Sequence, residues 1–239
     1  MWLALETATD CASVALGFPG AVAAEENLSG SRRHAAGLVP IVLAALGKAG
    51  ASLGHIEGVV LADGPGSFTG LRVGAAFAKA LVGARGLPLW TAPSLMVMAL
   101  GTVSPDGTAI LAVQDALRGE LYAAVFRVFR GRVESLLPPT VLTPEAVIRT
   151  APRPALVVGS ADAEVLNRLA TWSGADPILP PASAPRASVL LGLVGRAGGA
   201  RRVEDPGQWE PEYGRPAEAQ VRWEVAHGRR LPDSSGQLS

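Results

Sequence analysis

The sequence predicts an α/β protein built from two copies of one structural unit. Short apolar or alternating segments are interleaved with apolar segments of helix length, and the order of the segments repeats. Corresponding features, such as the turn glycines Gly20 and Gly131, lie about 110 residues apart. With 239 residues, of which 49% are hydrophobic, the chain can bury one large core or two modest ones. Fibrous, disordered and disulfide-rich classes are therefore excluded.

The first half predicts three strands followed by two helix–strand units and a further helix. Pro19 and Gly20 form the turn between the second and third strands. The expected strands are Trp2–Leu5, Cys11–Gly17, Ala21–Glu26, Glu57–Leu61 and Pro88–Trp90, and the expected helices are Arg33–Ala49, Phe68–Ala84 and Ser94–Gly101. A turn-rich segment, Thr102–Gly107, follows them and is the candidate boundary between two lobes.

The second half predicts the same order. Arg130 and Gly131 form a turn, and Thr143 with Pro144 has the pattern of a helix cap followed by proline at the first helical position. The expected strands are Ala109–Gln114, Glu120–Phe129, Val133–Leu137 and Ala155–Val158, and the expected helices begin at Pro144 and cover Ala161–Trp172 and Ala187–Gly198.

Three consecutive strands joined by tight turns are antiparallel, whereas a strand reached through a helix can be parallel, so each half should form a mixed sheet flanked by helices. This is the element order of an RNase H-like fold, and two tandem copies give the actin-like (ASKHA) architecture. We expect an N-terminal lobe at 1–105 and a C-terminal lobe at 106–215. A tail follows at 216–239 and is expected to be partly disordered.

Charge and cysteine content restrict the classes of function. The 21 basic residues balance the 21 acidic ones and are evenly spread, which argues against a chain that grips nucleic acid alone. Cys11 is the single cysteine; it has no disulfide partner and is interpreted as a small buried hydrophobe rather than a nucleophile. No apolar stretch has the length to cross a bilayer, and nothing at the N-terminus resembles an export signal, so we expect a cytoplasmic protein.

A glycine-rich loop follows the predicted strand Glu57–Leu61 and opens a helix. Glycine allows backbone N–H groups to approach a ligand, and a helix N-terminus favours an anion. The loop therefore offers a candidate site for a phosphate or carboxylate at Gly64, Gly66, Ser67 and Thr69. The alternative is a tight turn in which Ser67 or Thr69 caps the helix, because the loop matches neither common phosphate-binding pattern.

Small residues continue along that helix at intervals of four: Gly66, Gly70, Gly74 and Ala78. Glycine inside a helix costs about 1 kcal/mol relative to alanine, so the row indicates close approach by another helix. The preceding helix has one charge, Lys48, between Ala35 and Ala49 and must be covered on both sides. The two helices therefore predict a protein-binding face, with burial under the second lobe of the same chain as the alternative.

The loop sequence GPGSFTGLRVG, the N-terminal ETAT, the DALRGELY segment and the EPEYGR segment together resemble the TsaB (YeaZ) family. The resemblance covers both lobes and implies a tandem actin-like fold. It also implies a non-catalytic subunit that dimerises with the related subunit TsaD and activates it. TsaD transfers a threonylcarbamoyl group to N6 of adenosine 37 in tRNAs that read ANN codons. A third subunit, TsaE, is the ATPase; the chain alone would form a homodimer and reach tRNA through the complex.

The resemblance assigns the residues roles other than catalysis. Glu6 and Asp115 stand at the acidic positions of the actin-like cleft, but bulky residues replace the glycines that should follow, so no catalytic residue is assigned. Arg72 and Arg118 join the candidate nucleotide or anion site, with an exposed helix arginine as the alternative for Arg72. The expected interface positions are His34, Leu38, Ile41, Val42, Ala45, Gly70, Gly74 and Ala78. No cofactor is assigned to the chain; ATP or ADP with Mg²⁺ at an interface of the complex is left open.

Two other functions compete with this prediction. A small-molecule kinase or ATPase would use Glu6 and Asp115 to hold Mg²⁺ and the glycine-rich loop to hold phosphate. A metalloprotease would need paired histidines, but His34, His55 and His227 are not spaced four apart, and Leu38 occupies the position one turn after His34. No metal site is therefore predicted.

Overall fold

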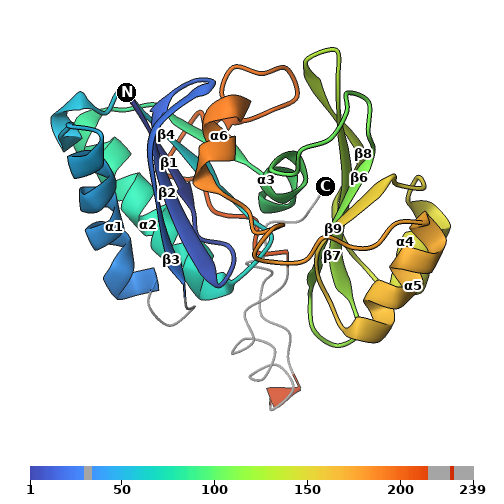
Figure 1. The fold of residues 1–239 in the computed structure, drawn as a ribbon. Helices are drawn as coiled ribbons and strands as arrows, with labels where there is room; N and C mark the ends of the chain where they lie inside the picture. The colour runs from blue at the N-terminus through green and yellow to red at the C-terminus, as the bar shows by residue number, and fades with distance from the viewer. Residues whose placement is uncertain (30–33, 215–226, 229–239) are drawn as a thin grey trace.

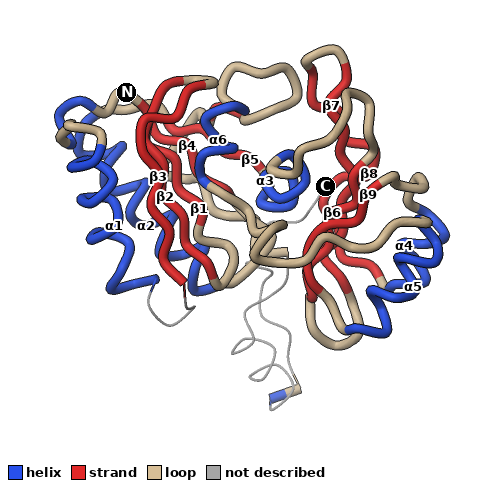
Figure 2. The backbone as a smooth tube through the Cα atoms, viewed as in Figure 1, coloured by secondary structure: helices blue, strands red, loops and turns tan. Residues whose placement is uncertain are grey.

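The computed structural model describes residues 1–29, 34–214 and 227–228, and it shows two mixed β-sheets with helices between and outside them (Figures 1 and 2). The predicted tail at 216–239, with Trp223, lies almost entirely outside the described residues, as does Arg215. Within the part of the chain that the structure describes, no helix is long and apolar enough to span a membrane.

The first sheet has the strand order β10-β5-β4-β1-β2-β3. Its strands are β1 (Trp2–Glu6), β2 (Cys11–Phe18), β3 (Ala21–Ser29), β4 (Gly58–Ala62), β5 (Leu89–Ala92) and β10 (Arg201–Arg202). The pairs β1–β2 and β2–β3 are antiparallel because tight turns join these strands, whereas β4 and β5 follow helices and run parallel to β1.

The second sheet has the order β8-β7-β6-β9, with β9 parallel to β6 and the other pairs antiparallel. Its strands are β6 (Ile110–Asp115), β7 (Leu121–Phe129), β8 (Arg132–Leu142) and β9 (Leu156–Ser160). This order repeats that of β3-β2-β1-β4 in the first sheet. The predicted tandem RNase H-like architecture is therefore confirmed.

The helices complete five layers (Figure 1). They are α1 (His34–Lys48), α2 (Phe68–Arg85), α3 (Ser94–Leu100), α4 (Pro144–Thr150), α5 (Ala163–Ser173) and α6 (Ala187–Leu193), with a short 3-10 turn at Leu53–His55. The helices α1 and α2 cover the outer face of the first sheet, and α4 and α5 cover the outer face of the second. The remaining two helices, α3 and α6, contact each other between the sheets.

The central layer joins the two halves of the chain. Helix α3, from the first half, packs on β6, β7 and β9, whereas α6, from the second half, packs on the first sheet. One buried cluster accordingly runs from Ala4 and Ala15 through α3 and α6 to Phe126. The chain also returns to the first sheet at β10, which pairs with β5. The division into lobes at residue 105 stays a prediction.

Several boundaries differ from those predicted. The helix expected over Ala187–Gly198 ends at Leu193, and the following loop contains Gly195 and Gly198 with φ of +73° and +72°. Such left-handed conformations end an α-helix. The strand expected at Val133–Leu137 continues to Leu142.

The glycine row on α2 faces the interior of its own chain. Gly70, Gly74 and Ala78 are buried, and a Cβ atom on Gly74 would collide with the Thr7 hydroxyl and lie 3.1 Å from a Leu61 methyl group. The small residues therefore let α2 approach β1 and β4 closely.

We predict that Gly74→Ala lowers the free energy of unfolding by about 1–3 kcal/mol, because Thr7 and Leu61 must shift to admit the methyl group. Gly83 lies on the same helix with open space around it, so the control Gly83→Ala should raise stability by up to about 1 kcal/mol through helix propensity. Urea denaturation of both variants measures the difference. Equal stability of the two variants would contradict the packing described for α2.

Candidate functional site

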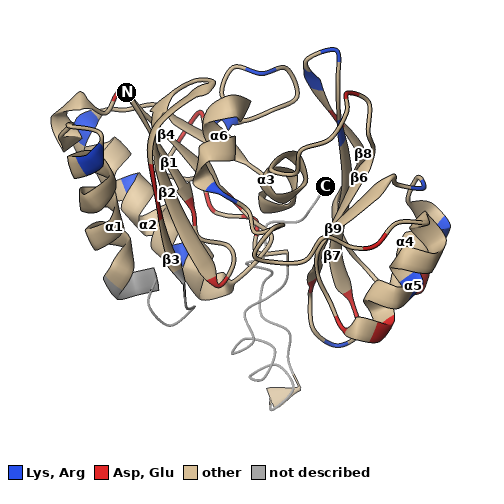
Figure 3. Cartoon of the chain, viewed as in Figure 1, with Lys and Arg blue, Asp and Glu red and all other residues tan. Residues whose placement is uncertain are grey.

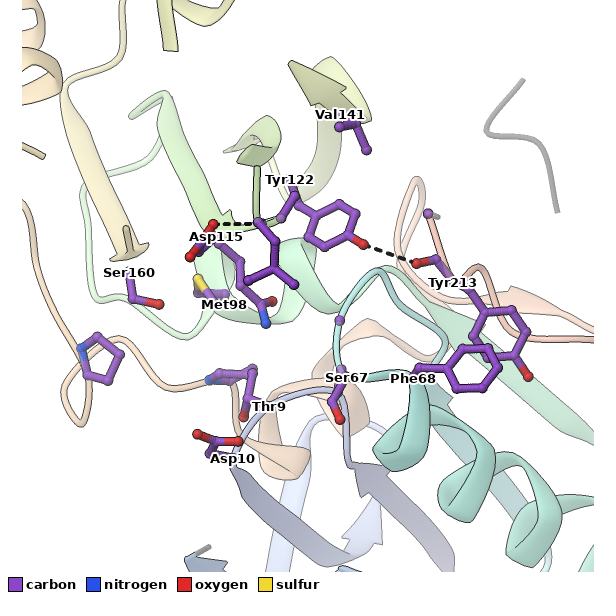
Figure 4. Close-up of a pocket in the computed structure, with 18 of the residues that line it drawn as sticks. Thr9, Asp10, Ser67, Phe68, Met98, Asp115, Tyr122, Val141, Ser160 and Tyr213 are labelled. Carbon is purple, nitrogen blue, oxygen red and sulfur yellow. Dashed lines mark hydrogen bonds between the residues drawn. The ribbon is translucent and has the colours of Figure 1, made fainter. Parts of the chain in front are cut away.

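A cleft of about 1170 Å³ opens between the two sheets (Figure 4). Its first wall comes from the β1–β2 turn and from the start of α2, and its second wall comes from the turn between β6 and β7. Tyr213 and Gly214, near the end of the continuously described chain, close one side. In an actin-like fold this is the place where a nucleotide would bind, so we tested whether the residues fit a phosphate chain.

Backbone groups of the first wall are hydrogen-bonded to other parts of the same chain. Glu6 ends β1, is fully buried, and accepts a hydrogen bond from the Ala8 amide at 2.6 Å. The Ala8 carbonyl in turn accepts from the Ser67 amide at 2.7 Å, and a Cβ atom on Gly66 would collide with that carbonyl. Glu6 therefore stabilises the turn and does not line the cleft, unlike Asp115 of the second wall.

Ser67 caps helix α2 in the way that the alternative interpretation of the loop requires. Its hydroxyl accepts from the Gly70 amide at 3.3 Å. Thr69 is exposed in the first turn of the helix. Two of the N–H groups that would favour an anion here, those of Ser67 and Gly70, are thus already bound.

A second close approach, between Gly64 and the backbone of Glu212, requires glycine at this position. Its φ is +112°, and a Cβ atom there would collide with the Glu212 carbonyl oxygen. The Glu212 amide donates to the Asp63 carbonyl at 2.8 Å, so residues 210–214, which we call the strap, lie directly on the glycine-rich loop. The strap continues to the second sheet, where the Tyr122 hydroxyl donates to the Tyr213 carbonyl at 3.3 Å (Figure 4).

The second wall is a left-handed turn made without glycine at its centre. Leu117 and Arg118 have φ of +63° and +58°, and Gly119 follows at +76°. The Asp115 carboxylate accepts from the Leu117 amide at 2.7 Å and holds the turn in place (Figure 4). Leu117 is 63% exposed and lines the cleft with a bulky side chain where a glycine would have none.

The charges of the cleft also disfavour a phosphate chain. Asp10, Asp115 and Glu120 line it, against the single lining cation Arg118. The amides of one wall are already hydrogen-bonded and the other wall carries bulky side chains, so these residues do not fit a nucleoside triphosphate. Among the described residues, no group of three His, Cys, Asp or Glu side chains could hold a metal ion.

Arg72 lies outside the cleft. Its guanidinium stacks on the Phe68 ring at 4.1 Å and lies 5.9 Å from the Tyr213 ring, while the two rings are 4.7 Å apart. Arg72 therefore fastens the strap to α2 by a cation–π contact. Trp209, which precedes the strap, packs on the first-sheet core and lies 5.9 Å from the Lys79 ammonium.

The buried carboxylates are two residues that end neighbouring strands, Glu6 on β1 and Asp63 just after β4. Both are fully buried. Burial raises the pKa of Glu6 to about 8, although the Ala8 amide acts in the opposite direction. Burial also raises the pKa of Asp63 to about 6, although Arg201 lowers it through an ion pair at 2.9 Å. One oxygen of each carboxylate and the Thr7 hydroxyl have no hydrogen-bond partner among the described residues.

The predicted interface positions lie mostly beneath the surface. Leu38, Val42 and Ala45 are at most 2% exposed, and Ile41 is half-buried. The α2 positions Gly70, Gly74 and Ala78 are buried as well. His34 begins α1, and its side chain lies outside the described part of the structure. The outer surface of the helix pair belongs to neighbouring positions, among which Val39 and Leu43 are 50% and 56% exposed.

Sequence reasoning did not find Arg201 or Tyr122, which hold the strap at Glu212 and at Tyr213. Arg201 belongs to a strand of two residues with no alternation pattern, and Tyr122 is one of several apolar residues in β7. The EPEYGR segment was the available signal, because it contains the strap that these two residues hold.

The fold and the described residues of the cleft define an actin-like α/β protein whose cleft lining does not fit a phosphate chain. The family model described as TsaD, tRNA N6-adenosine threonylcarbamoyltransferase, matches residues 26–178. The chain belongs to that family and, within it, to the TsaB (YeaZ) group.

Individual relatives agree with this assignment. The tRNA threonylcarbamoyladenosine biosynthesis protein TsaB of Escherichia coli is 40% identical over 52% of this chain, and the match spans about half of that protein (54%). TsaB of Bacillus subtilis is 27% identical over 92% of this chain and 96% of its own length. A Pseudomonas aeruginosa crystal structure, described as similar to peptidase YEAZ, has a TM-score of 0.74 and 28% identity over 90% of this chain and 99% of its own.

We predict that the raised pKa of Glu6 makes the protein less stable as pH rises. Between pH 4.5 and about 8 the folded state keeps the Glu6 proton and the unfolded state releases it, so the free energy of unfolding falls with pH in this window. Glu6→Gln mimics the protonated acid and should exceed the wild type in stability by about 1 kcal/mol or more at pH 8, with little difference at pH 4.5.

Urea denaturation at a series of pH values measures this difference. Glu164 is exposed, and the control Glu164→Gln should leave the pH dependence of the wild type unchanged. A constant offset between Glu6→Gln and the wild type at every pH would contradict a titrating Glu6.

Proposed function

We propose that this chain is a non-catalytic subunit in the biosynthesis of tRNA threonylcarbamoyladenosine. It would act by dimerising with a TsaD-type subunit, which transfers the threonylcarbamoyl group to N6 of adenosine 37 in tRNAs that read ANN codons. Membership of the TsaB (YeaZ) group supports this role. In the proposal a TsaE-type ATPase completes the complex, the isolated chain forms a homodimer, and the complex works in the cytoplasm.

The observation that carries the proposal is the apolar outer face of α1 and α2. Val39 and Leu43 are half exposed on α1, and Ala76 and Ala80 are exposed on α2. The basic residue of α1, Lys48, lies in its last turn, and charged residues are sparse on both helices (Figure 3). Exposed apolar surface of this kind is typical of a protein-binding face. The buried glycine row lets α2 lie close on the sheet and so helps to shape this face.

The cleft supports the non-catalytic part of the proposal. A kinase or ATPase positions a phosphate chain and neutralises its charge. Here the Asp115 turn places Leu117 on the cleft wall, whereas Glu6 does not line the cleft and accepts from the Ala8 amide through one carboxylate oxygen. We therefore expect no sustained ATP hydrolysis by the purified chain. Turnover that Glu6→Ala abolishes would contradict the non-catalytic role.

Reconstitution tests the function directly. Purified TsaD-type and TsaE-type subunits are incubated with tRNA, threonylcarbamoyl adenylate and ATP, with and without this chain, and modified adenosine is measured by mass spectrometry. We expect modification only when the chain is present. Equal modification in its absence would refute the proposal.

Leu43→Glu should weaken association with the TsaD-type subunit at least tenfold, because it places a carboxylate in the apolar contact. Leu43 is 56% exposed, so the substitution should leave thermal stability nearly unchanged. Leu179 is 46% exposed on another surface, and Leu179→Glu is the matched control that should associate normally. Sedimentation velocity and co-purification measure both. Normal association of Leu43→Glu would place the interface elsewhere.

A further inference from the structure

We propose that the tip of the β7–β8 hairpin and the loop after α6 form a contact surface for the phosphate backbone of RNA. We call Phe129, Arg130, Arg132 and Arg196 the arginine patch. It lies away from the cleft, and it extends beyond the proposed function, in which tRNA reaches this chain only through its partner.

The arginine patch is assembled from two distant parts of the sequence. The hairpin brings Phe129 directly opposite Arg132 across β7 and β8. The Val133 amide donates to the Ala197 carbonyl at 2.9 Å, which places the α6–β10 loop, with Arg196, beside the hairpin. Figure 3 shows blue segments on the loop after α6 and on the hairpin of β7 and β8, both at the top of the molecule. The contact is close, because a Cβ atom on Gly198 would collide with the Val133 carbonyl.

All four members of the patch are exposed. Within the described residues, Arg130, Arg132 and Arg196 form no ion pair. The exposed arginines therefore keep their donors available for an anion.

The neighbouring acidic groups only partly offset the cations. Arg127 lies on the same hairpin and is paired with Glu134 at 2.5 Å. The Asp106 carboxylate accepts from the Arg130 backbone amide at 3.1 Å. Counting Arg127 with the three arginines of the patch, four cations face these two acids, so an excess of two positive charges remains locally in a chain whose formal net charge is zero.

The turn at the tip adds a second observation. Arg130 and Gly131 have φ of +51° and +77°, and a two-residue hairpin turn with both φ values positive favours Asn-Gly or Asp-Gly. An arginine at the first position is conformationally unfavourable, and strain of this kind collects at functional positions. Here it projects a guanidinium from the end of the hairpin.

The aromatic residue favours RNA over an acidic protein as the occupant. Phe129 is 38% exposed, and its ring centre lies 5.5 Å from the Arg127 guanidinium and 5.1 Å from the Arg130 guanidinium. Exposed aromatic rings and guanidinium planes offer stacking to unpaired bases, while the charges bind phosphates. Since arginine donors contact phosphate without reading sequence, the expected binding is largely sequence-independent.

The test is fluorescence anisotropy of a labelled tRNA transcript with the purified full chain over a series of salt concentrations. Arg130→Glu combined with Arg132→Glu should weaken binding about tenfold or more and make the dependence on log salt shallower by about 1–2. Arg130→Lys combined with Arg132→Lys keeps the charge and should stay within about threefold of the wild type.

The matched control is Arg149→Glu combined with Arg202→Glu, which changes net charge by the same amount at exposed positions elsewhere. It should bind within about threefold of the wild type. Equal weakening by the control pair, or wild-type affinity in the Arg130 and Arg132 charge reversal, would overturn the proposal. So would absence of tRNA binding by the wild-type chain. Loss of TsaD co-purification with unchanged tRNA affinity would show that the patch contacts protein instead.

The outcome is independent of the proposed function. Anisotropy is measured without the other subunits and without modification. The reconstitution can therefore support the proposed function while the anisotropy measurement contradicts RNA binding by the arginine patch, or the reverse.

Discussion

The buried carboxylate of Asp63 is the constraint on which the rest of the structure depends. It stands at the end of β4 with no exposed surface, and an isolated charge there would cost several kcal/mol. Its cation is Arg201, which the chain provides only after the second sheet is complete. Arg201 also binds Glu212, whose amide donates to the Asp63 carbonyl. The first sheet is therefore complete only when the end of the second half returns to it.

This return explains why the two halves interlock. The segment that brings Arg201 into place passes through α6, which packs on the first sheet, while α3 from the first half packs on the second. The strap then crosses to Tyr122 on β7. The cleft walls are thus tied together through both the central layer and the strap. Such ties favour a fixed arrangement of the two sheets, which suits the proposed role of a subunit that presents surfaces to partners.

Much of the fold follows from local patterns. The antiparallel strands β1 to β3 and β6 to β8 were predictable because turn residues such as Gly20 and Gly131 separate alternating segments, and the parallel strands follow helices. Strand β10 was not predictable, since two arginines carry no pattern and pair with β5 only through tertiary contacts. The end of α6 was missed because an apolar run alone does not show where glycines take positive φ.

The site was harder to predict because the same residue types serve opposite purposes. A row of small residues indicates close approach but does not identify what approaches. In this chain the row at Gly74 admits Thr7 and Leu61 of its own sheet. Likewise, Gly64 and Gly66 were candidates for an anion site, yet they admit the carbonyl groups of Glu212 and Ala8. Only the three-dimensional neighbours distinguish the two uses.

The two proposed contact surfaces differ in charge and lie on different parts of the structure. The apolar face of α1 and α2 lies on the outer layer of the first sheet, whereas the arginine patch lies where the β7–β8 hairpin meets the loop after α6. A protein partner on one surface leaves the other open. Because Coulomb attraction over water weakens within about 10 Å at 0.1 M salt, the local excess of two charges acts only over short distances. The arginine patch would therefore bind the tRNA backbone by direct contact, with or without the partner in place.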